Sequence, residues 1–307
     1  MAPAIDVFNP VYGNFTVPSL NAMPEDRQDQ LGVYAQDHIQ FAEHWSVMLG
    51  IRKDRATSES EGDPESRNVD GAVTGRAGLV YNTNLGLAPY FSFSQSFQPF
   101  AGTDIFNNPY EPIRAKQWEA GAKFQPGTSS NLISGAVFDI RQQNRLTPDP
   151  SNPLNSIQVG EARIRGVELE GRTKPFWGLN LIVNYGFLDA RVSKSNGPDL
   201  GKRIPIIPKH FGSFWGVKSF RIDRLPGSLS AGGGIRYNGS SFDGDDLLKT
   251  PAYTLYDLML AYDTSTWRLS INAANLTDKV YVASCLSRGD CFYGIRRAVT
   301  ATIRNRF

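Results

Sequence analysis

The sequence lacks most of the features that mark soluble enzymes and helical membrane proteins. Its 307 residues include two cysteines and three histidines, and the formal net charge is +2. Such a balanced charge gives no sign of the strong field that attracts nucleic acid. No apolar run approaches the roughly 18 residues that a transmembrane helix needs. Membrane-crossing strands stay open as an interpretation, because alternating residues keep the mean hydropathy low, and it is −0.33 here.

Glycine and aromatic residues, by contrast, are plentiful, with 29 glycines and 11% aromatic residues. This composition suits many short strands between turns. Several segments alternate with a period of two, which indicates strands with one apolar and one polar face. Clear examples are 45–52, 91–97, 179–187, 267–273 and 299–307. The last segment ends on the aromatic residue Phe307, which fits the closing strand of an outer-membrane barrel.

The alternating pattern predicts thirteen strands. They cover roughly residues 28–41, 43–54, 72–84, 88–97, 115–125, 130–145, 155–173, 178–193, 207–221, 227–240, 252–263, 266–276 and 292–307. The connections between them mostly alternate between short and long, and the long ones are 55–71, 98–114, 194–206, 241–251 and 277–291. Tight periplasmic turns and long outer loops are typical of an antiparallel up-and-down barrel. The predicted fold class is therefore all-β, an antiparallel transmembrane β-barrel.

The polar face of these strands carries many charges, which a narrow barrel could neither hydrate nor pair. They are Arg52, Glu119, Lys123, Glu168, Glu170, Arg172, Arg304 and Arg306. A wide barrel with a plug or water inside accommodates them. The triplet Gly232–Gly234 fits a strand that is sharply bent or pressed against such a plug.

Thirteen antiparallel strands cannot close on themselves, since an odd number leaves two unpaired edges. Residues 1–27 are predicted to be the tail of an outer loop, and residues 28–307 supply the strands. Residues 1–6 show neither the basic start nor the apolar core of a signal peptide. An outer-membrane protein carries such a peptide, so we expect this chain to be the later part of a longer protein.

Cys285 and Cys291 lie close together in a turn-rich segment predicted to be outside the membrane. Their spacing favours a disulfide in an oxidising compartment, and two free thiols are the alternative. A metal site is not expected there, because no histidine or further cysteine lies nearby.

Nine segments in order resemble one family. They are 5–13 (IDVFNPVYG), 32–41 (GVYAQDHIQF), 49–54 (LGIRKD), 92–99 (SFSQSFQP), 116–124 (KQWEAGAKF), 163–171 (RIRGVELEG), 208–210 (PKH), 275–281 (NLTDKVY) and 291–307 (CFYGIRRAVTATIRNRF). The chain resembles the carboxyl-terminal part of TonB-dependent outer-membrane receptors, in particular ferric hydroxamate siderophore receptors of the ferrichrome type. The resemblance implies the last 13 strands of a barrel of about 22 strands. It also implies a plug domain and a TonB box that this sequence does not contain.

The resemblance implies uptake of a ferric siderophore of the hydroxamate type across the outer membrane, with no enzyme chemistry and no cofactor. Iron would be cargo, held by the siderophore and not by this chain. The expected partners are the siderophore, outer-membrane lipid, and the TonB–ExbB–ExbD system acting through the plug, with no nucleic acid. One alternative is a truncated receptor fragment without transport activity, and another is a porin or adhesin.

The candidate ligand-binding residues are Phe292 and Tyr293, which follow Cys291 directly. Aromatic rings suit a bulky, mostly neutral ferric hydroxamate, and an aromatic girdle at the membrane interface is the alternative.

Other features have weaker interpretations. The outer-loop aromatics Phe100, Phe106 and Tyr110 suit ligand capture or a loop packing on itself. The trio Asp243, Asp245 and Asp246 suits an exposed acidic loop better than a calcium site. The histidines His38, His44 and His210 form no legible catalytic constellation with serine.

Overall fold

The computed structural model describes residues 25–60, 63–100, 102–104, 108–127, 129–149, 152–174, 178–223, 226–287 and 289–306. The terminal Phe307 and most of the predicted loop 1–27 lie outside the described residues. Within the described ranges no helix is long and apolar enough to cross a membrane.

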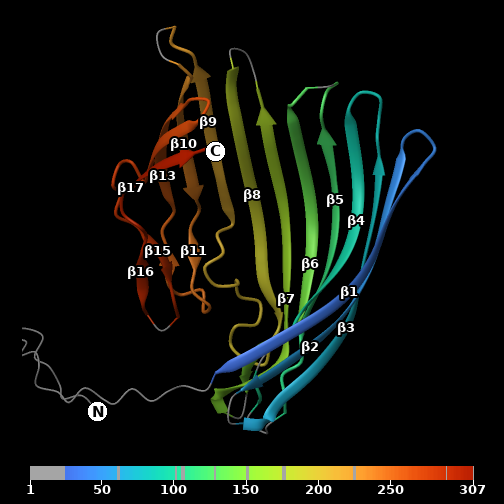
Figure 1. Cartoon of the computed structure of the whole chain (residues 1–307). Coiled ribbons are helices and arrows are strands. Elements are labelled where there is room, and N and C mark those ends of the chain that lie inside the picture. The colour runs from blue at the N-terminus through green and yellow to red at the C-terminus, as the bar shows by residue number, and fades with distance from the viewer. Residues whose placement is uncertain are drawn as a thin grey trace, which may run out of the picture.

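One antiparallel sheet of thirteen strands makes up most of the fold (Figure 1). Its strands are β1 (Asp26–Phe41), β2 (Trp45–Ser60), β3 (Asp63–Tyr81), β4 (Leu87–Gln98), β5 (Ile113–Phe124), β6 (Leu132–Asp149), β7 (Asn152–Thr173), β8 (Leu179–Lys194), β9 (His210–Phe220), β10 (Ser228–Asn238), β13 (Tyr253–Asp263), β14 (Trp267–Ala274) and β17 (Ala298–Asn305). Each strand pairs with the next one in this order, and β1 does not pair with β17. The predicted strand number and the all-β antiparallel class are confirmed.

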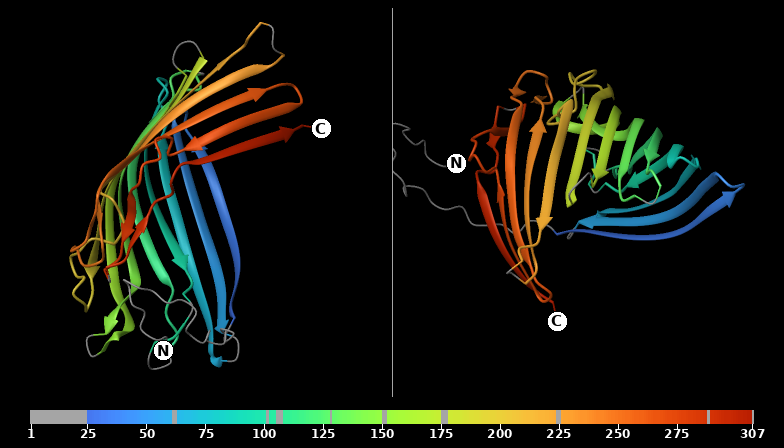
Figure 2. Two further views of the ribbon diagram at one scale, coloured as in Figure 1. Left: turned by 90° about the vertical axis from the view of Figure 1, so that its left-hand side faces the viewer. Right: turned by 90° about the horizontal axis from the view of Figure 1, so that it is seen from above.

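The sheet is curved, and among the described residues its edge strands β1 and β17 each pair with one neighbour only. Seen from above, it bends into an arc with β1 and β17 at its ends (Figure 2). The short turns gather at one end of the strands, the upper end in Figure 1. The long connections lie at the other end, where β8 leads to β9 and β14 leads to β17.

Two sequence predictions about the long-loop end were wrong. The segment 55–71 was expected to be a loop, but β2 and β3 continue through it and pair almost to their tips, from Asp54↔Ala72 to Ser58↔Asn68. The segment 292–307 was expected to be one strand, but it divides into β16 (Cys291–Tyr293) and β17. At 55–71 the period-two pattern reports only the half-buried part of each strand and misses the part that projects beyond the apolar band. At 292–307 it does not detect the break at residues 294–297 that separates the two strands.

Two small ribbons lie among the long connections. β11 (Ser241–Phe242) pairs with β12 (Lys249–Thr250), and β15 (Val282–Cys285) pairs with β16. These ribbons give internal order to the predicted loops 241–251 and 277–291.

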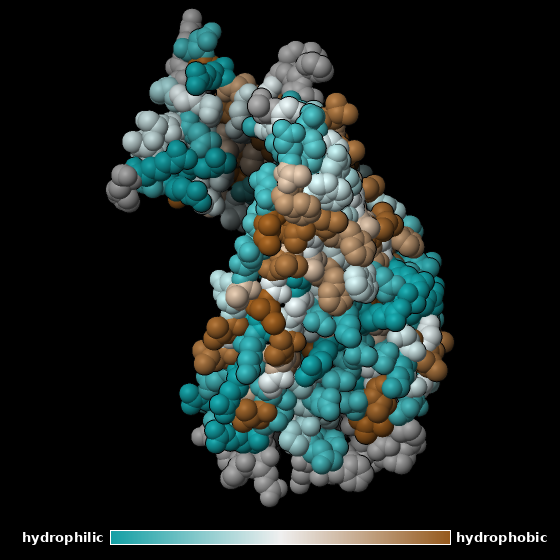
Figure 3. Space-filling model, turned by 90° about the vertical axis from the view of Figure 1, so that its right-hand side faces the viewer, coloured by the Kyte–Doolittle hydropathy of each residue, from teal (hydrophilic) through white to brown (hydrophobic). Residues whose placement is uncertain are grey.

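The two faces of the sheet differ in chemistry. One face carries apolar side chains that follow one another across the strands in register, for example Val183↔Phe214 and Phe214↔Ile235. They are largely exposed, and Figure 3 shows hydrophobic side chains gathered in the upper half of the visible face above mostly hydrophilic ones. The other face carries the predicted polar set, with Ser92↔Glu119 and Ala136↔Glu168 in register. In a barrel the apolar face meets lipid and the polar face lines the interior.

Gly234 lies against a bulky side chain of the neighbouring strand, a contact that the sequence did not reveal. A Cβ atom on Gly234 would lie 1.9 Å from Cε3 of Trp215, on the neighbouring strand β9. The indole ring therefore lies directly over this glycine on the interior face of the sheet.

Candidate site at the outer mouth

The last outer connection, residues 275–297, is anchored by a buried asparagine. Asn275 is 2% exposed and adopts a positive φ of 50°, a conformation that asparagine tolerates well. Its side-chain amide donates to the carbonyl oxygens of Lys279 at 2.9 Å and Ile295 at 3.2 Å, so it joins both stems of the connection. Its backbone N–H donates to Asp257 of β13 at 2.9 Å. The segment NLTDKVY therefore forms the exit from β14 into this connection.

A second contact joins the two ends of the same connection, through Asp278 near its start and Arg296 near its end. Asp278 accepts hydrogen bonds from Arg296 Nε at 2.9 Å and from the backbone N–H of Arg297 at 2.9 Å. The Arg296 guanidinium, followed by the Arg297 N–H, holds the pKa of Asp278 well below its usual range. We call this contact the Asp278 clamp. It holds the two ends of the connection together, and Asp278 stays ionised at neutral pH.

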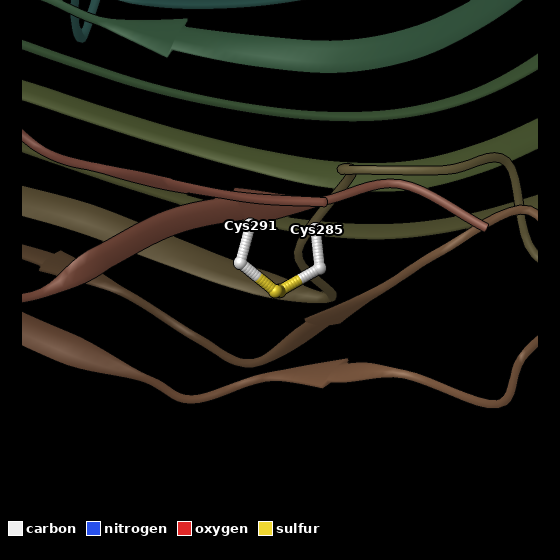
Figure 4. Close-up of a disulfide and its surroundings, with 2 residues drawn as sticks. All are labelled: Cys285 and Cys291. Carbon is white, nitrogen blue, oxygen red and sulfur yellow. A yellow bond between two sulfur atoms is a disulfide. The ribbon is translucent and has the colours of Figure 1, made fainter. Parts of the chain in front are cut away.

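Beyond the clamp, β15 and β16 form a hairpin that the two cysteines close. Cys285 and Cys291 are joined by a disulfide, as Figure 4 shows, and their Cα atoms lie 4.1 Å apart. Phe292 lies opposite Ser284, and Tyr293 lies opposite Val282. The predicted disulfide is present. It places Phe292 and Tyr293 next to the crosslink, with exposed fractions of 49% and 75%.

The ring of Tyr281 connects this hairpin to the neighbouring strand. Its centroid lies 4.3 Å from that of Tyr253, and the Tyr253 hydroxyl accepts a hydrogen bond from Asn238 at 2.6 Å. The small strands β11 and β12 also contact β15. The disulfide hairpin therefore packs against the connection between β10 and β13.

Two members of the acidic trio in that connection, Asp245 and Asp246, contact basic residues from the connection between β8 and β9. Lys202 Nζ lies 3.2 Å from Asp245, and Arg203 Nε lies 3.9 Å from Asp246. The Arg203 guanidinium also lies over the Phe242 ring, 4.0 Å from its centroid. Asp243 itself is buried and accepts backbone N–H groups of its own loop. The three connections β8–β9, β10–β13 and β14–β17 therefore contact one another at this end of the sheet. No group of residues suited to a metal ion occurs in the described ranges.

Several of the other aromatic and histidine residues singled out in the sequence pack against neighbouring rings. Phe100 and Tyr110 pack edge to face at 5.7 Å, in line with a loop that packs on itself. Phe106 lies outside the described residues. His44 packs against Tyr81 near a short turn, and His210 hydrogen-bonds the Tyr185 hydroxyl at 2.8 Å.

An interior cleft near β1–β4 was missed by the sequence argument. It has a volume of about 520 Å³ and is lined by polar side chains that include Tyr34, Gln36, Arg52 and Arg76. Arg52 is held by Asp54 at 2.7 Å, and Asp54 in turn accepts from Gln30 at 2.9 Å. The alternation of polar residues on β1 and β2 could have indicated it, but their cross-strand neighbours could not be read without the register.

The chain is similar to several known proteins over almost its whole length. The family profile described as TonB dependent receptor-like, beta-barrel, matches residues 2–276. The ferrioxamine B receptor of Salmonella typhimurium (strain LT2) is 36% identical over 316 residues, which cover 98% of this chain and 44% of that receptor. The ferrichrome outer membrane transporter/phage receptor of Escherichia coli (strain K12) is 34% identical, with 99% of this chain and 42% of that protein covered.

Solved structures show the same architecture. The ferric preacinetobactin receptor BauA of Acinetobacter baumannii superimposes with a TM-score of 0.78 at 20% identity, covering 97% of this chain and 46% of that one. The siderophore receptor PiuA of the same organism gives 0.77 at 23% identity, covering 92% and 44%. The chain therefore spans less than half the length of the proteins that it matches.

Proposed function

Because this chain belongs to the TonB-dependent receptor β-barrel family of the outer membrane, we propose that it forms part of the wall of a receptor for a ferric siderophore of the hydroxamate type. The whole receptor would carry the siderophore across the outer membrane. Relatives named for ferrioxamine B and for ferrichrome support this ligand class. The observation that carries the proposal is their match over nearly the whole chain together with the exposed aromatic hairpin at the outer mouth.

In this proposal the chain binds and positions, and it performs no covalent chemistry. Phe292 and Tyr293 would contact the siderophore, because their rings are exposed on a hairpin that the disulfide and the Asp278 clamp hold in place. Aromatic rings offer large contact areas at low entropic cost to a bulky, mostly neutral complex. Iron arrives chelated, so it is cargo. TonB, with ExbB and ExbD, would act through a plug domain, which the interior polar face of the sheet would surround.

The ligand-binding role of the hairpin is tested in the full-length receptor with Tyr293→Ala and Phe292→Ala. We expect each variant to weaken binding of a ferric hydroxamate about tenfold, as loss of roughly 1.4 kcal/mol of contact would do. Titration by intrinsic fluorescence gives the affinity. The matched control is Leu85→Ala, an exposed apolar residue in the short β3–β4 turn at the opposite end. Unchanged affinity in both aromatic variants would refute the contact.

The transport role is tested by deleting the intact gene and measuring uptake of radioactive iron. We expect uptake of one ferric hydroxamate to stop and to return with the wild-type gene. Normal uptake of every hydroxamate in the deletion strain would instead favour a fragment without transport activity.

A further inference from the structure

The interior face of β10 carries two polar side chains that connect to the outer hairpin. Arg236 and Asn238 lie on the same face of β10 as Gly234, with β13 as their neighbouring strand. Each side chain begins a separate route of hydrogen bonds and ring contacts. The two routes end at residues 294 and 295, which come directly after Tyr293 in the sequence.

The first route runs from Arg236 through Asp257 to Asn275. The Arg236 guanidinium donates to the Asp257 carboxylate from Nε at 2.5 Å and from Nη2 at 2.9 Å. Two parallel bonds of this kind fix the orientation of a carboxylate as well as its position. Asp257 Oδ1 also accepts the backbone N–H of Asn275 at 2.9 Å. The Asp257 side chain is 14% exposed, so these bonds are shielded from water.

Asn275 extends this route to the far end of the outer connection. Its side-chain amide donates to the carbonyl oxygens of Lys279 and Ile295, and its Oδ1 accepts the Lys279 N–H at 2.9 Å. The Ile295 side chain is 77% exposed, so its own burial does little to hold the backbone there. The Asn275 amide therefore connects residue 295 to the sheet through Asp257.

The second route runs from Asn238 through two tyrosine rings to Gly294. Asn238 Nδ2 donates to the Tyr253 hydroxyl at 2.6 Å, and the Tyr253 ring lies 4.3 Å from the Tyr281 ring. The Tyr281 ring lies over Gly294, where a Cβ atom would be 2.0 Å from Tyr281 Cζ. The Gly294 N–H also donates to the Tyr281 carbonyl oxygen at 2.8 Å. Only glycine permits such a close approach, and this glycine follows Tyr293 directly.

The hairpin itself does little to fix the two candidate ligand-binding rings relative to the sheet. In the described chain β16 pairs only with β15, and the disulfide joins these same two strands. The rings of Phe292 and Tyr293 are largely exposed. Their place at the mouth therefore depends on the backbone segments that enter and leave the hairpin, and both routes end on the segment that leaves it.

We propose that Arg236 and Asn238 are positioning residues, which hold Phe292 and Tyr293 where a ferric hydroxamate contacts them. The two polar residues act through the backbone that follows Tyr293 and not by touching the ligand. A ring that is already held in place loses less conformational freedom when a ligand binds. The proposal rests on the ligand contact proposed above for the two rings, and it adds that the affinity depends on interior polar groups of β10.

The first measurement is made without ligand, by hydrogen exchange of the full-length receptor. Amides of residues 281–295 should exchange at least about fivefold faster in Arg236→Gln, because loss of the Asp257 contact loosens the connection. Amides of β9 and β14 should keep their wild-type rates. The matched control is Arg268→Gln, which removes an arginine on the same face, 3.1 Å from Asp263 at the short-turn end. Equal exchange of residues 281–295 in the wild type and Arg236→Gln would overturn the proposal.

The second measurement is the affinity for a ferric hydroxamate. Arg236→Gln should weaken binding about threefold, through the greater freedom of the rings. It should cause no further loss when Phe292→Ala and Tyr293→Ala are already present, because residues that act through one another are not additive. Additive losses would overturn the positioning role. Unchanged affinity in both aromatic variants would refute the ligand contact itself, whereas normal exchange in Arg236→Gln refutes only the positioning role.

A substitution outside the main sheet covers the outcome in which Arg236→Gln fails to fold. Gly294→Ala would displace the Tyr281 ring, and residue 294 lies in the outer connection between β16 and β17. We expect the same faster exchange of residues 281–295. The matched control is Gly244→Ala, whose Cβ would meet nothing within 4 Å, in the connection between β11 and β12. Equal exchange in the two glycine variants would overturn the proposal.

Discussion

At the residue scale, the close packing of Trp215 on Gly234 makes one position intolerant of any side chain. Gly234→Ala should lower the stability of the folded receptor by about 1–3 kcal/mol, because the indole ring must move. The matched control is Gly233→Ala, whose Cβ would meet only a backbone oxygen at 3.7 Å. The folded, heat-modifiable form is followed on a gel, and the temperature at which it is lost compares the stabilities of the two variants. Adding Trp215→Ala to Gly234→Ala should recover part of the loss, and equal stability of the two single variants would contradict the packing argument.

The clamp at Asp278 predicts a pH dependence that is also local. The pKa of Asp278 is lowered in the folded loop by Arg296 and the Arg297 N–H, so its contribution is present above the unfolded pKa of about 3.9. That contribution is lost as the pH falls from about 4 toward the lowered folded pKa. Hydrogen exchange of residues 275–297, corrected for intrinsic rates, should show weaker protection in Asp278→Asn at pH 7. The difference from the wild type should shrink below pH 4, and a difference independent of pH would argue against the clamp.

At the element scale, the disulfide hairpin should be a local device and not a support of the sheet. Within the part of the chain that the structure describes, its two strands pair only with each other, while β14 pairs directly with β17. Cys285→Ser/Cys291→Ser should therefore leave the heat-modifiable form intact, although the chain-entropy estimate for so short a loop is about 2 kcal/mol. Limited proteolysis should cut near residues 282–293 faster than in the wild type. Loss of membrane assembly in this variant would show that the crosslink acts on the whole sheet.

At the scale of the whole molecule, the open edges of the sheet govern its assembly. The strands β1 and β17 run in the same direction, since twelve antiparallel steps separate the first and last of thirteen strands. They cannot pair with each other as an antiparallel ladder, and exposed edges of this kind associate with other chains. Residues 1–307 directed to the outer membrane by themselves should give protease-sensitive or aggregated material, and a monomeric heat-modifiable barrel would contradict this. Restoring the additional strands of a full-length receptor should restore the folded form.

Local sequence patterns were enough to predict the number of strands in the main sheet, the two faces of its strands and the end at which the long connections lie, and they favoured the disulfide that the structure shows. All of these follow from local information, because side chains alternate along a strand and turn residues mark its ends. Phe292 and Tyr293 were proposed from the cysteine that precedes them, and the structure exposes both rings beside the crosslink.

The tertiary structure alone decided which residues from different strands lie side by side. The sequence shows Lys116, Arg141, Arg163 and Arg191 as separate charges, and only the register aligns them into one row. In the same way, Trp215 meets Gly234 only because of the pairing of β9 with β10. Register depends on turn geometry, bulges and the burial of whole faces, and a shift of one residue would move every side chain to the opposite face. Such information is spread over the complete sheet, so no single segment of the sequence contains it.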